Sequence, residues 1–185
     1  MTYTITTPST VEPLSVAEVK AALAIDSDIT DFDSTIGSLI KAAREQAEHE
    51  TGRVLMPQTL RLSLVDWPDD LVITKAPVRS VVSVQYFDGS TWQTLAAEAY
   101  VPWEDGLLWR IDPVASWPSL GSTPGHRVRV NFTAGYEDAA SVPHSIKRWM
   151  IAQIGSWLKN VEAAGQKLEL NPAIATLLDA ERLYV

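Results

Sequence analysis

The stretch Asp31–Gly52 reads DFDSTIGSLIKAAREQAEHETG and predicts the long helix around which the rest of the chain is organised. Thr30 is expected to cap the first turn, Asp33 adds negative charge near the positive end of the helix, and Gly52 ends it. Its apolar residues recur at three- and four-residue steps and form one narrow stripe: Ile36, Leu39, Ile40, Ala43 and Ala47. At about 1.5 Å per residue the helix would be about 30 Å long, and other elements must cover its stripe. The stretch therefore predicts a scaffold, and it carries no catalytic motif.

The composition is that of an ordinary globular protein and narrows the classes of function. The chain has 185 residues, of which 46% are hydrophobic and 21% charged, so one domain can bury its own core. It has no cysteine, which excludes disulfides and thiolate metal sites and fits a reducing cytosol. The net charge of -8 makes the chain a poor candidate for binding nucleic-acid phosphates. We find no apolar run near the roughly 20 residues that span a bilayer, and no signal-peptide pattern at the start, so no membrane partner is expected.

Patterns on both sides of the long helix predict an α+β fold. Ser15 and Glu18 form a capping box that begins a short helix, and the period changes from 3.6 to 2 after Gly52. Thr2–Thr10 is expected to be an extended arm and 112–125 a long loop. The expected helices cover 15–24, 31–51, 143–159 and 172–182, and the expected strands cover 58–65, 71–74, 80–87, 91–95, 107–111 and 127–133.

These elements lead us to expect a single domain spanning residues 1–185. Its helical core, at 14–56 and 142–185, is a small bundle with a long central helix and short N- and C-terminal helices. A β-rich insertion at 57–135 lies between the second and third helices, and the long helix is expected to pack against the 143–159 helix. The polar stretch 160–170 is expected to be a mobile hinge before the terminal helix.

Residues that could carry chemistry are scattered. Glu45, Glu48 and His49 could ligate a metal, because positions 45 and 49 share a helix face, but a solvated helix face is the more ordinary interpretation. The three histidines lie in separate elements, no serine has a nucleophile-elbow context, and Gly121–Gly125 is a proline-containing turn rather than a phosphate loop. We therefore predict no catalytic, cofactor-binding or metal site, and no enzyme.

Tryptophans in the β-rich region leave a second function open. Aromatic platforms on a β scaffold can bind sugars, whereas the ordinary interpretation is packing in the core and at interfaces. We favour packing and keep a carbohydrate-binding or other binding module built on the insertion as the alternative. The residues concerned are Trp67, Trp92, Trp103, Trp109 and Trp117.

An ordered set of short motifs resembles the head–tail connector, or adaptor (head-completion), proteins of long-tailed bacteriophages and gene transfer agents. Each motif alone is degenerate, but together they cover nearly the whole chain, with the loosest match between Trp67 and Arg127. The motifs are Leu14–Lys20 (LSVAEVK), Ile36–Glu45 (IGSLIKAARE), Thr51–Leu55 (TGRVL), Gln58–Leu62 (QTLRL), Trp67-Pro68, Val130–Tyr136 (VNFTAGY), Val142-Pro143 and Ile146-Lys147.

The resemblance implies a structural role in the virion. Such adaptors form a ring, usually of twelve copies, beneath the portal protein. They join the head to a stopper or tail-terminator protein, and they line the channel through which DNA leaves without specific binding. The protein would be made in the bacterial host cytoplasm and would act at the head–tail interface. Because no long heptad seam is present, we expect the isolated chain to be a monomer or weak oligomer at micromolar concentration and to close into a ring only on the portal.

The C-terminal segment, Asn171–Val185, is the candidate portal contact. Its apolar patch is too small to hold a short helix in place without a partner surface, and a helix after a hinge suits docking into a groove. The alternative is that the segment packs back on its own domain. The candidate residues are Ile174, Leu177, Leu178, Arg182 and Tyr184.

Overall fold

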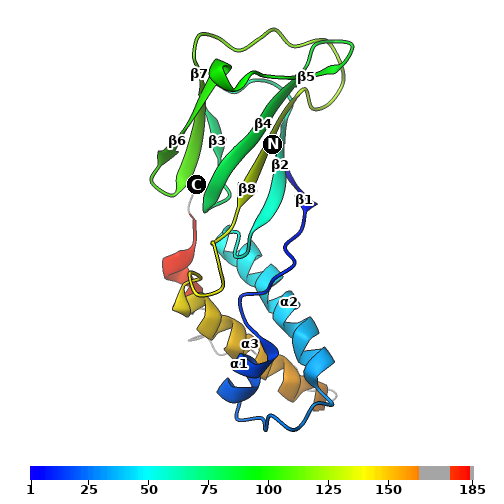
Figure 1. Cartoon of the computed structure of the whole chain (residues 1–185), viewed down its shortest axis with the longest axis vertical. Helices are drawn as coiled ribbons and strands as arrows, with labels where there is room; N and C mark the ends of the chain where they lie inside the picture. The colour runs from blue at the N-terminus through cyan, green and yellow to red at the C-terminus, as the bar shows by residue number, and fades with distance from the viewer. Residues whose placement is uncertain (163–175, 184–185) are drawn as a thin grey trace. The chain divides into compact units, whose positions relative to one another are not determined.

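The computed structural model of the chain describes residues 1–162 and 176–183, which divide into two units of different secondary structure (Figure 1). Residues 10–56 and 136–185 form the helical unit, and residues 1–9 and 57–135 form the β unit. The α+β class expected from the sequence is confirmed. The hinge expected at 160–170 falls almost entirely outside the described residues.

The helical unit is built around α2, and its expected helices are present with small shifts of their ends. The unit contains α1 (Val16–Ala22), α2 (Asp33–Thr51), α3 (His144–Glu162) and the 3₁₀ helix η2 (Thr176–Glu181). In Figure 1, α2 and α3 lie side by side, as expected. The described part of the terminal helix expected at 172–182 is thus a 3₁₀ helix.

The start of α1 confirms the sequence prediction, whereas the start of α2 does not. The Ser15 hydroxyl accepts the Glu18 N–H at 3.2 Å, and the Glu18 carboxylate accepts the Ser15 N–H at 2.7 Å. Thr30 is not the cap of α2, because the N-cap position is Phe32, which has no capping side chain. Thr30 contributes only its carbonyl, which accepts the Asp33 N–H at 3.0 Å. The Asp33 carboxylate accepts instead from the buried Lys20 ammonium at 3.0 Å, a long-range contact that the local pattern does not reveal.

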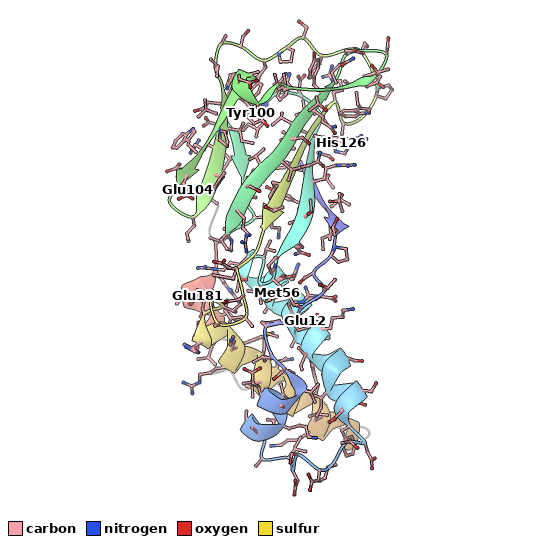
Figure 2. The ribbon with its side chains drawn as sticks, viewed as in Figure 1. Glu12, Met56, Tyr100, Glu104, His126 and Glu181 are labelled. Atoms are coloured by element: carbon pink, nitrogen blue, oxygen red, sulfur yellow. The ribbon has the colours of Figure 1, made fainter. Side chains whose placement is uncertain are left out.

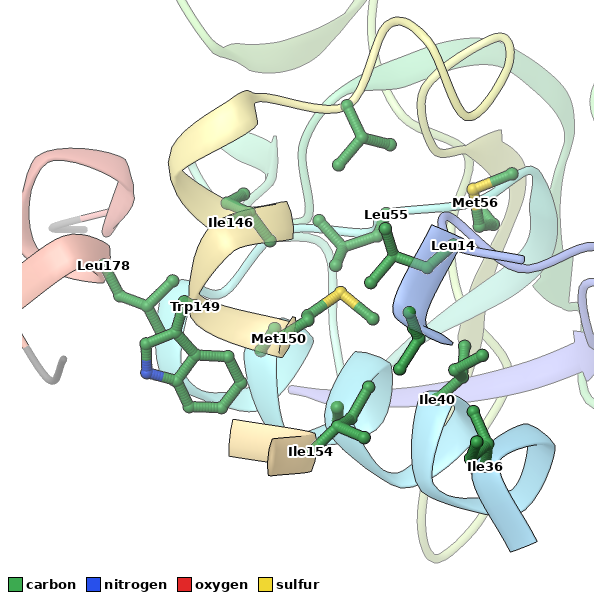
Figure 3. Packing of buried hydrophobic residues seen from close by; sticks show 14 residues of the cluster. Leu14, Ile36, Ile40, Leu55, Met56, Ile146, Trp149, Met150, Ile154 and Leu178 are labelled. Atoms are coloured by element: carbon green, nitrogen blue, oxygen red, sulfur yellow. The ribbon is translucent and has the colours of Figure 1, made fainter. Parts of the chain in front are cut away.

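The predicted apolar stripe of α2 forms the core of the helical unit together with α3. Ile36, Ala43 and Ala47 are fully buried, and Leu39 packs partly buried beside them. Met150, Leu55 and Leu14 point toward one another in the close view (Figure 3). Each large apolar side chain buried in this way contributes about 1.5–3 kcal/mol relative to an exposed one.

The β unit consists of two antiparallel sheets. Its strands are β1 (Thr2–Thr7), β2 (Gln58–Leu64), β3 (Leu71–Ile73), β4 (Val78–Phe87), β5 (Trp92–Thr94), β6 (Tyr100–Asp105), β7 (Leu108–Pro113) and β8 (Val128–Ala134), with a 3₁₀ turn η1 (Ala97–Ala99). One sheet has the order β1-β2-β8-β4-β5 and the other β3-β7-β6. Six strands match the expected ones within a few residues, and 114–127 is a loop.

Two edge strands were missed in the sequence. β6 contains Pro102, and its side chains after Tyr100 are exposed, so it lacks the alternation that marks a half-buried strand. β1 was expected only to be an extended arm. Tyr3 fastens it, because its ring lies edge-on to Phe132 with centroids 6.1 Å apart and its hydroxyl accepts the Thr74 N–H at 2.8 Å. Burial raises the pKa of Tyr3 above its ordinary value.

Alternation along β2 and β8 separates a buried face from an open face. Leu60, Leu62 and Leu64 point into the core of the unit, as do Val128, Val130 and Phe132 on β8. The residues between them stay half-buried on the open side. Leu71, Ile73 and Ile111 supply the buried side chains of the three-stranded sheet.

The predicted hairpin at Asp88-Gly89 is present, and Gly121 packs against it. The Asp88 carboxylate accepts the Ser90 and Thr91 N–H groups at 2.8 and 2.9 Å. The Gly121 N–H donates to the Phe87 carbonyl at 2.8 Å. A Cβ at position 121 would overlap the Gly89 backbone, so position 121 requires glycine.

Candidate functional site

The C-terminal segment was the candidate contact surface, and part of it is described. Leu178 is 1% exposed within the core of the helical unit, and Leu177 packs partly buried against that core. The Arg182 guanidinium lies 3.2 Å from a Glu50 carboxylate oxygen. Ile174 and Tyr184 lie outside the described residues.

Arg53 anchors this segment to the end of α2. Its Nε donates to the Glu181 carbonyl at 2.7 Å, and its guanidinium pairs with the Glu181 carboxylate at 3.1 Å. Its third contact is the Tyr136 hydroxyl at 2.7 Å. Figure 2 marks Glu181 on η2, and the next turn adds a bond from the Leu183 N–H to the Thr51 carbonyl at 2.9 Å. The described residues of the segment therefore pack on their own unit, which was the alternative to docking.

Among the possible metal ligands on α2, Glu48 has structural partners. The Glu48 carboxylate accepts the Leu55 N–H at 2.8 Å and pairs with Arg44 at 3.1 Å. Among the residues that the structure describes, no three His, Cys, Asp or Glu side chains are grouped to hold a metal ion. Within the same residues, no helix has both the length and the apolar character to cross a membrane.

Four of the five tryptophans of the β unit contact other side chains. Trp67 stacks on Trp117 with ring centroids 4.2 Å apart and an interplanar angle of 5°. The Trp103 indole N–H donates to Asp112 at 2.7 Å. The guanidinium of Arg129 lies over the ring of Trp92, 3.7 Å from its centroid. The Trp67–Trp117 stack and the Arg129 guanidinium over Trp92 each cover one ring face that a sugar would need.

Arg129 belongs to a surface that the sequence analysis missed, which we call the arginine face: Arg61, Trp92, Arg129 and Asn131 on the open side of the five-stranded sheet. Arg61 lies opposite Asn131 in the β2–β8 register, and Arg129 lies two residues away opposite Ser63. The two arginines are therefore diagonal neighbours on adjacent strands. The sequence does place both arginines at polar positions of strands with alternating side chains. Its spacing does not show that Arg61 and Arg129 are neighbours, because only the pairing of β2 with β8 brings them together.

Hydrogen bonds hold the arginine face in place. The Arg61 Nε donates to the Asn131 amide oxygen at 2.9 Å, and the Asn131 amide nitrogen donates to the Ser83 hydroxyl at 2.9 Å. Desolvation, followed by repulsion from Arg61, lowers the pKa of Arg129 from its ordinary value. Neither guanidinium forms an ion pair with a carboxylate in the parts of the chain that the structure describes.

Solved structures of other proteins have a similar fold. No family model and no curated protein sequence matches the chain. The chain is similar, with a TM-score of 0.82 and 22% identity, to a chain in the neck of an empty gene transfer agent (GTA) particle computed with C6 symmetry. A chain of the virion of a native GTA particle gives 0.81 and 23%, and one of the neck of a native GTA particle computed with C12 symmetry gives 0.77 and 22%. The fold is that of a chain of GTA particles.

The likeness extends over the whole molecule. Each of the three alignments covers 100% of this chain and 97% of the other. Both the helical unit and the β unit therefore have counterparts in those structures, and so do the strands that form the arginine face.

Proposed function

We propose that the chain is a structural component of the neck of a phage-like particle, where it joins the head to the tail. The observation that carries this proposal is the fold likeness to GTA neck chains over the full length of both chains. The motif resemblance to head–tail connectors, which rests on other grounds, supports the same role. The residues of the chain act as a scaffold in this role, and none is assigned to catalysis.

The finer proposal is an adaptor ring of twelve copies between the portal and a stopper or tail-terminator protein. The C12 symmetry of one of the similar particles supports a closed ring, because a head-to-tail interface closes when its rotation divides the circle. The helical unit carries 15 acidic and 9 basic residues and the β unit 8 and 6. An acidic ring repels phosphates and so lets DNA pass without specific binding.

Portal docking by the C-terminal segment stays part of this proposal. The residues proposed for it are Ile174, Leu177, Arg182 and Tyr184, whereas Leu178, the fifth candidate, is buried in the core of the helical unit and supports the segment from inside. Because Leu178 lies in the core and Glu181 is bound by Arg53, the segment would dock with its η2 turn still seated on the helical unit.

The test is the morphology of the particles. Cells that make the particle but lack this chain should produce DNA-filled heads without tails, and supplying the chain should restore tailed particles. Electron microscopy of negatively stained particles gives the readout. Normal tailed particles in the absence of the chain would contradict the proposal.

A further inference from the structure

The buried cations of the helical unit and the two arginines of the arginine face differ in what they bind. Lys20 is 5% exposed and donates to the carbonyls of Ser27 and Ile29 at 2.9 and 2.8 Å, in addition to Asp33. Arg44 is 6% exposed and is paired with Glu12 and Glu48. These charges are used inside the fold. Arg61 and Arg129, in contrast, sit side by side without a carboxylate partner among the described residues.

Two neighbouring guanidinium groups without a counterion form a site for an anion. Their mutual repulsion disfavours the charged pair, and a carboxylate between them would remove that cost. The fork of a guanidinium matches a carboxylate with two parallel hydrogen bonds. Because Asn131 already holds Arg61 and Trp92 already holds Arg129, binding an anion would cost little side-chain conformational entropy.

The same chain carries a matching acidic surface, which we call the acidic turn: residues 25–33, between α1 and α2. Asp26, Asp28 and Asp31 are exposed and make no ion pair within residues 1–162 and 176–183. Lys20 fixes the backbone of the turn from inside by its bonds to two of its carbonyls. The exposed apolar residues Ile29 and Phe32, 45% and 48% exposed, lie among these carboxylates.

We infer that the arginine face of one copy binds the acidic turn of the next copy, so that the two surfaces form a head-to-tail interface of the ring. The inference rests on the proposed function for the ring itself and adds the surfaces through which it closes. The two surfaces are different patches of the chain, as a heterologous interface requires, and their opposite charges favour contact between them. Exposed ion pairs contribute only about 0.2–1 kcal/mol each, so the isolated chain stays largely monomeric at low concentration.

A carboxylate surface fits the arginine face better than DNA does. Strong binding to duplex DNA takes about 6–10 phosphate contacts, whereas this face supplies two arginines on a chain of net charge -8. The ring of Trp92 is covered by Arg129 and is not free to stack on a base.

The test uses two charge-reversed chains, R61E/R129E and D28K/D31K, in sedimentation velocity. A protein concentration of about 0.5 mM makes association detectable when its binding free energy is about 4 kcal/mol. At this concentration wild type should self-associate in about 20 mM salt and dissociate in about 500 mM salt. Each variant alone should associate at least about tenfold more weakly, a difference of about 1.4 kcal/mol. An equimolar mixture of the two should recover the association, because the reversed charges complement each other.

The matched control for R61E/R129E is K41E/R148E, which changes the net charge by the same amount at two exposed positions of the helical unit. This control should associate like wild type. Circular dichroism melting shows whether each variant folds, and R61Q/R129Q replaces the glutamate variant if that one does not. The inference is wrong if wild type stays monomeric in low salt, if R61Q/R129Q associates normally, or if the mixture does not recover.

Duplex DNA tests the competing ligand. Fluorescence anisotropy should show no binding of a labelled duplex by wild type in low salt. Binding that R61Q/R129Q abolishes would make the arginine face a nucleic-acid surface and overturn the inference. Failure of the inference leaves the neck assignment standing, since particle morphology is measured independently, and loss of the neck assignment would leave the association result intact.

Discussion

The helical unit and the arginine face of the β unit use charge in opposite ways. In the helical unit, cations tie together segments that are far apart in the sequence, such as Arg44 with Glu12 and Arg53 with Glu181. The β unit also has such pairs, Arg110 with Asp70 and Arg127 with Asp66. On the arginine face, however, the ladder hydrogen bonds already join the strands, and Arg61 and Arg129 pair with no carboxylate among the described residues. Arg44 and Arg53 are thus used within the fold, whereas Arg61 and Arg129 remain available to another molecule.

Core truncation should have the largest effect and tests whether the two units depend equally on apolar packing. Phe132→Ala in the β unit should lower the free energy of unfolding by about 4 kcal/mol, because a fully buried ring leaves a cavity. Ile154→Ala in the helical unit should cost about 3 kcal/mol. Urea denaturation gives the free energies of unfolding. A loss below about 1 kcal/mol at either site would show that the unit concerned does not depend on this apolar packing.

Removing a paired cation should cost much more than removing an unpaired one. Arg44→Met should lower the free energy of unfolding by about 3 kcal/mol, because the buried Arg44 guanidinium is the shared cation of the Glu12 and Glu48 carboxylates. Arg61→Met is the matched substitution on the arginine face and should cost less than about 1 kcal/mol. Equal losses for the two variants in urea titrations would remove the distinction between the units.

The C-terminal anchor comes next in size. Leu178→Ala should cost about 2 kcal/mol, at the low end for a buried leucine, because the short η2 segment can shift into the space. Leu107→Ala is the control, since Leu107 is 53% exposed and should change stability by less than about 0.5 kcal/mol. If Leu178→Ala is also neutral by thermal and urea unfolding, the segment does not belong to the core of the helical unit.

The capping box of α1 should show a smaller, local effect. Ser15→Ala should cost about 1 kcal/mol, because it removes the acceptor of the Glu18 N–H. The pKa of Glu18, which the Ser15 N–H and hydroxyl hold below its ordinary value, should rise toward that value. NMR titration of the Glu18 carboxyl measures this, with Ser119→Ala in an exposed loop as the control. An unchanged pKa would show that the box does not form.

The smallest effect is a pH dependence in the β hairpin. Bonds from the Thr91 and Ser90 N–H groups, and then from Gln93, lower the pKa of Asp88 from 3.8 to about 2. Since the folded pKa is depressed, the contribution is complete above pH 3.8 and is lost as the pH falls toward about 2. Asp88→Asn should flatten the stability profile in this window, measured by thermal melts. An NMR titration midpoint near 3.8 would contradict the account.

Much of the fold could be predicted because its signals are local. The stripe of Ile36 and Ile40 and the Ser15–Glu18 box act within a few residues, and so does the Asp88-Gly89 turn. The prediction of Thr30 as the cap was wrong, because α2 begins after Phe32 and the carboxylate of its first residue, Asp33, is bound by Lys20 from another helix. β6 was missed because an exposed edge strand has no alternation to recognise.

The candidate site was harder to predict because it depends on contacts between distant segments. Arg61 and Arg129 become neighbours only through the β2–β8 register. Leu178 looked like an apolar residue of a docking helix, and only the contacts of η2 with Arg53 and Thr51 reveal that it is buried. The portal contacts themselves stay a prediction.

The most direct test of the proposed role is an electron cryomicroscopy map of intact particles from cells that encode this chain. The account predicts a closed ring of copies of this chain in the neck, directly beneath the portal, with both the helical unit and the β unit fitting the density. A neck built from other chains, or purified particles that lack this chain, would contradict it.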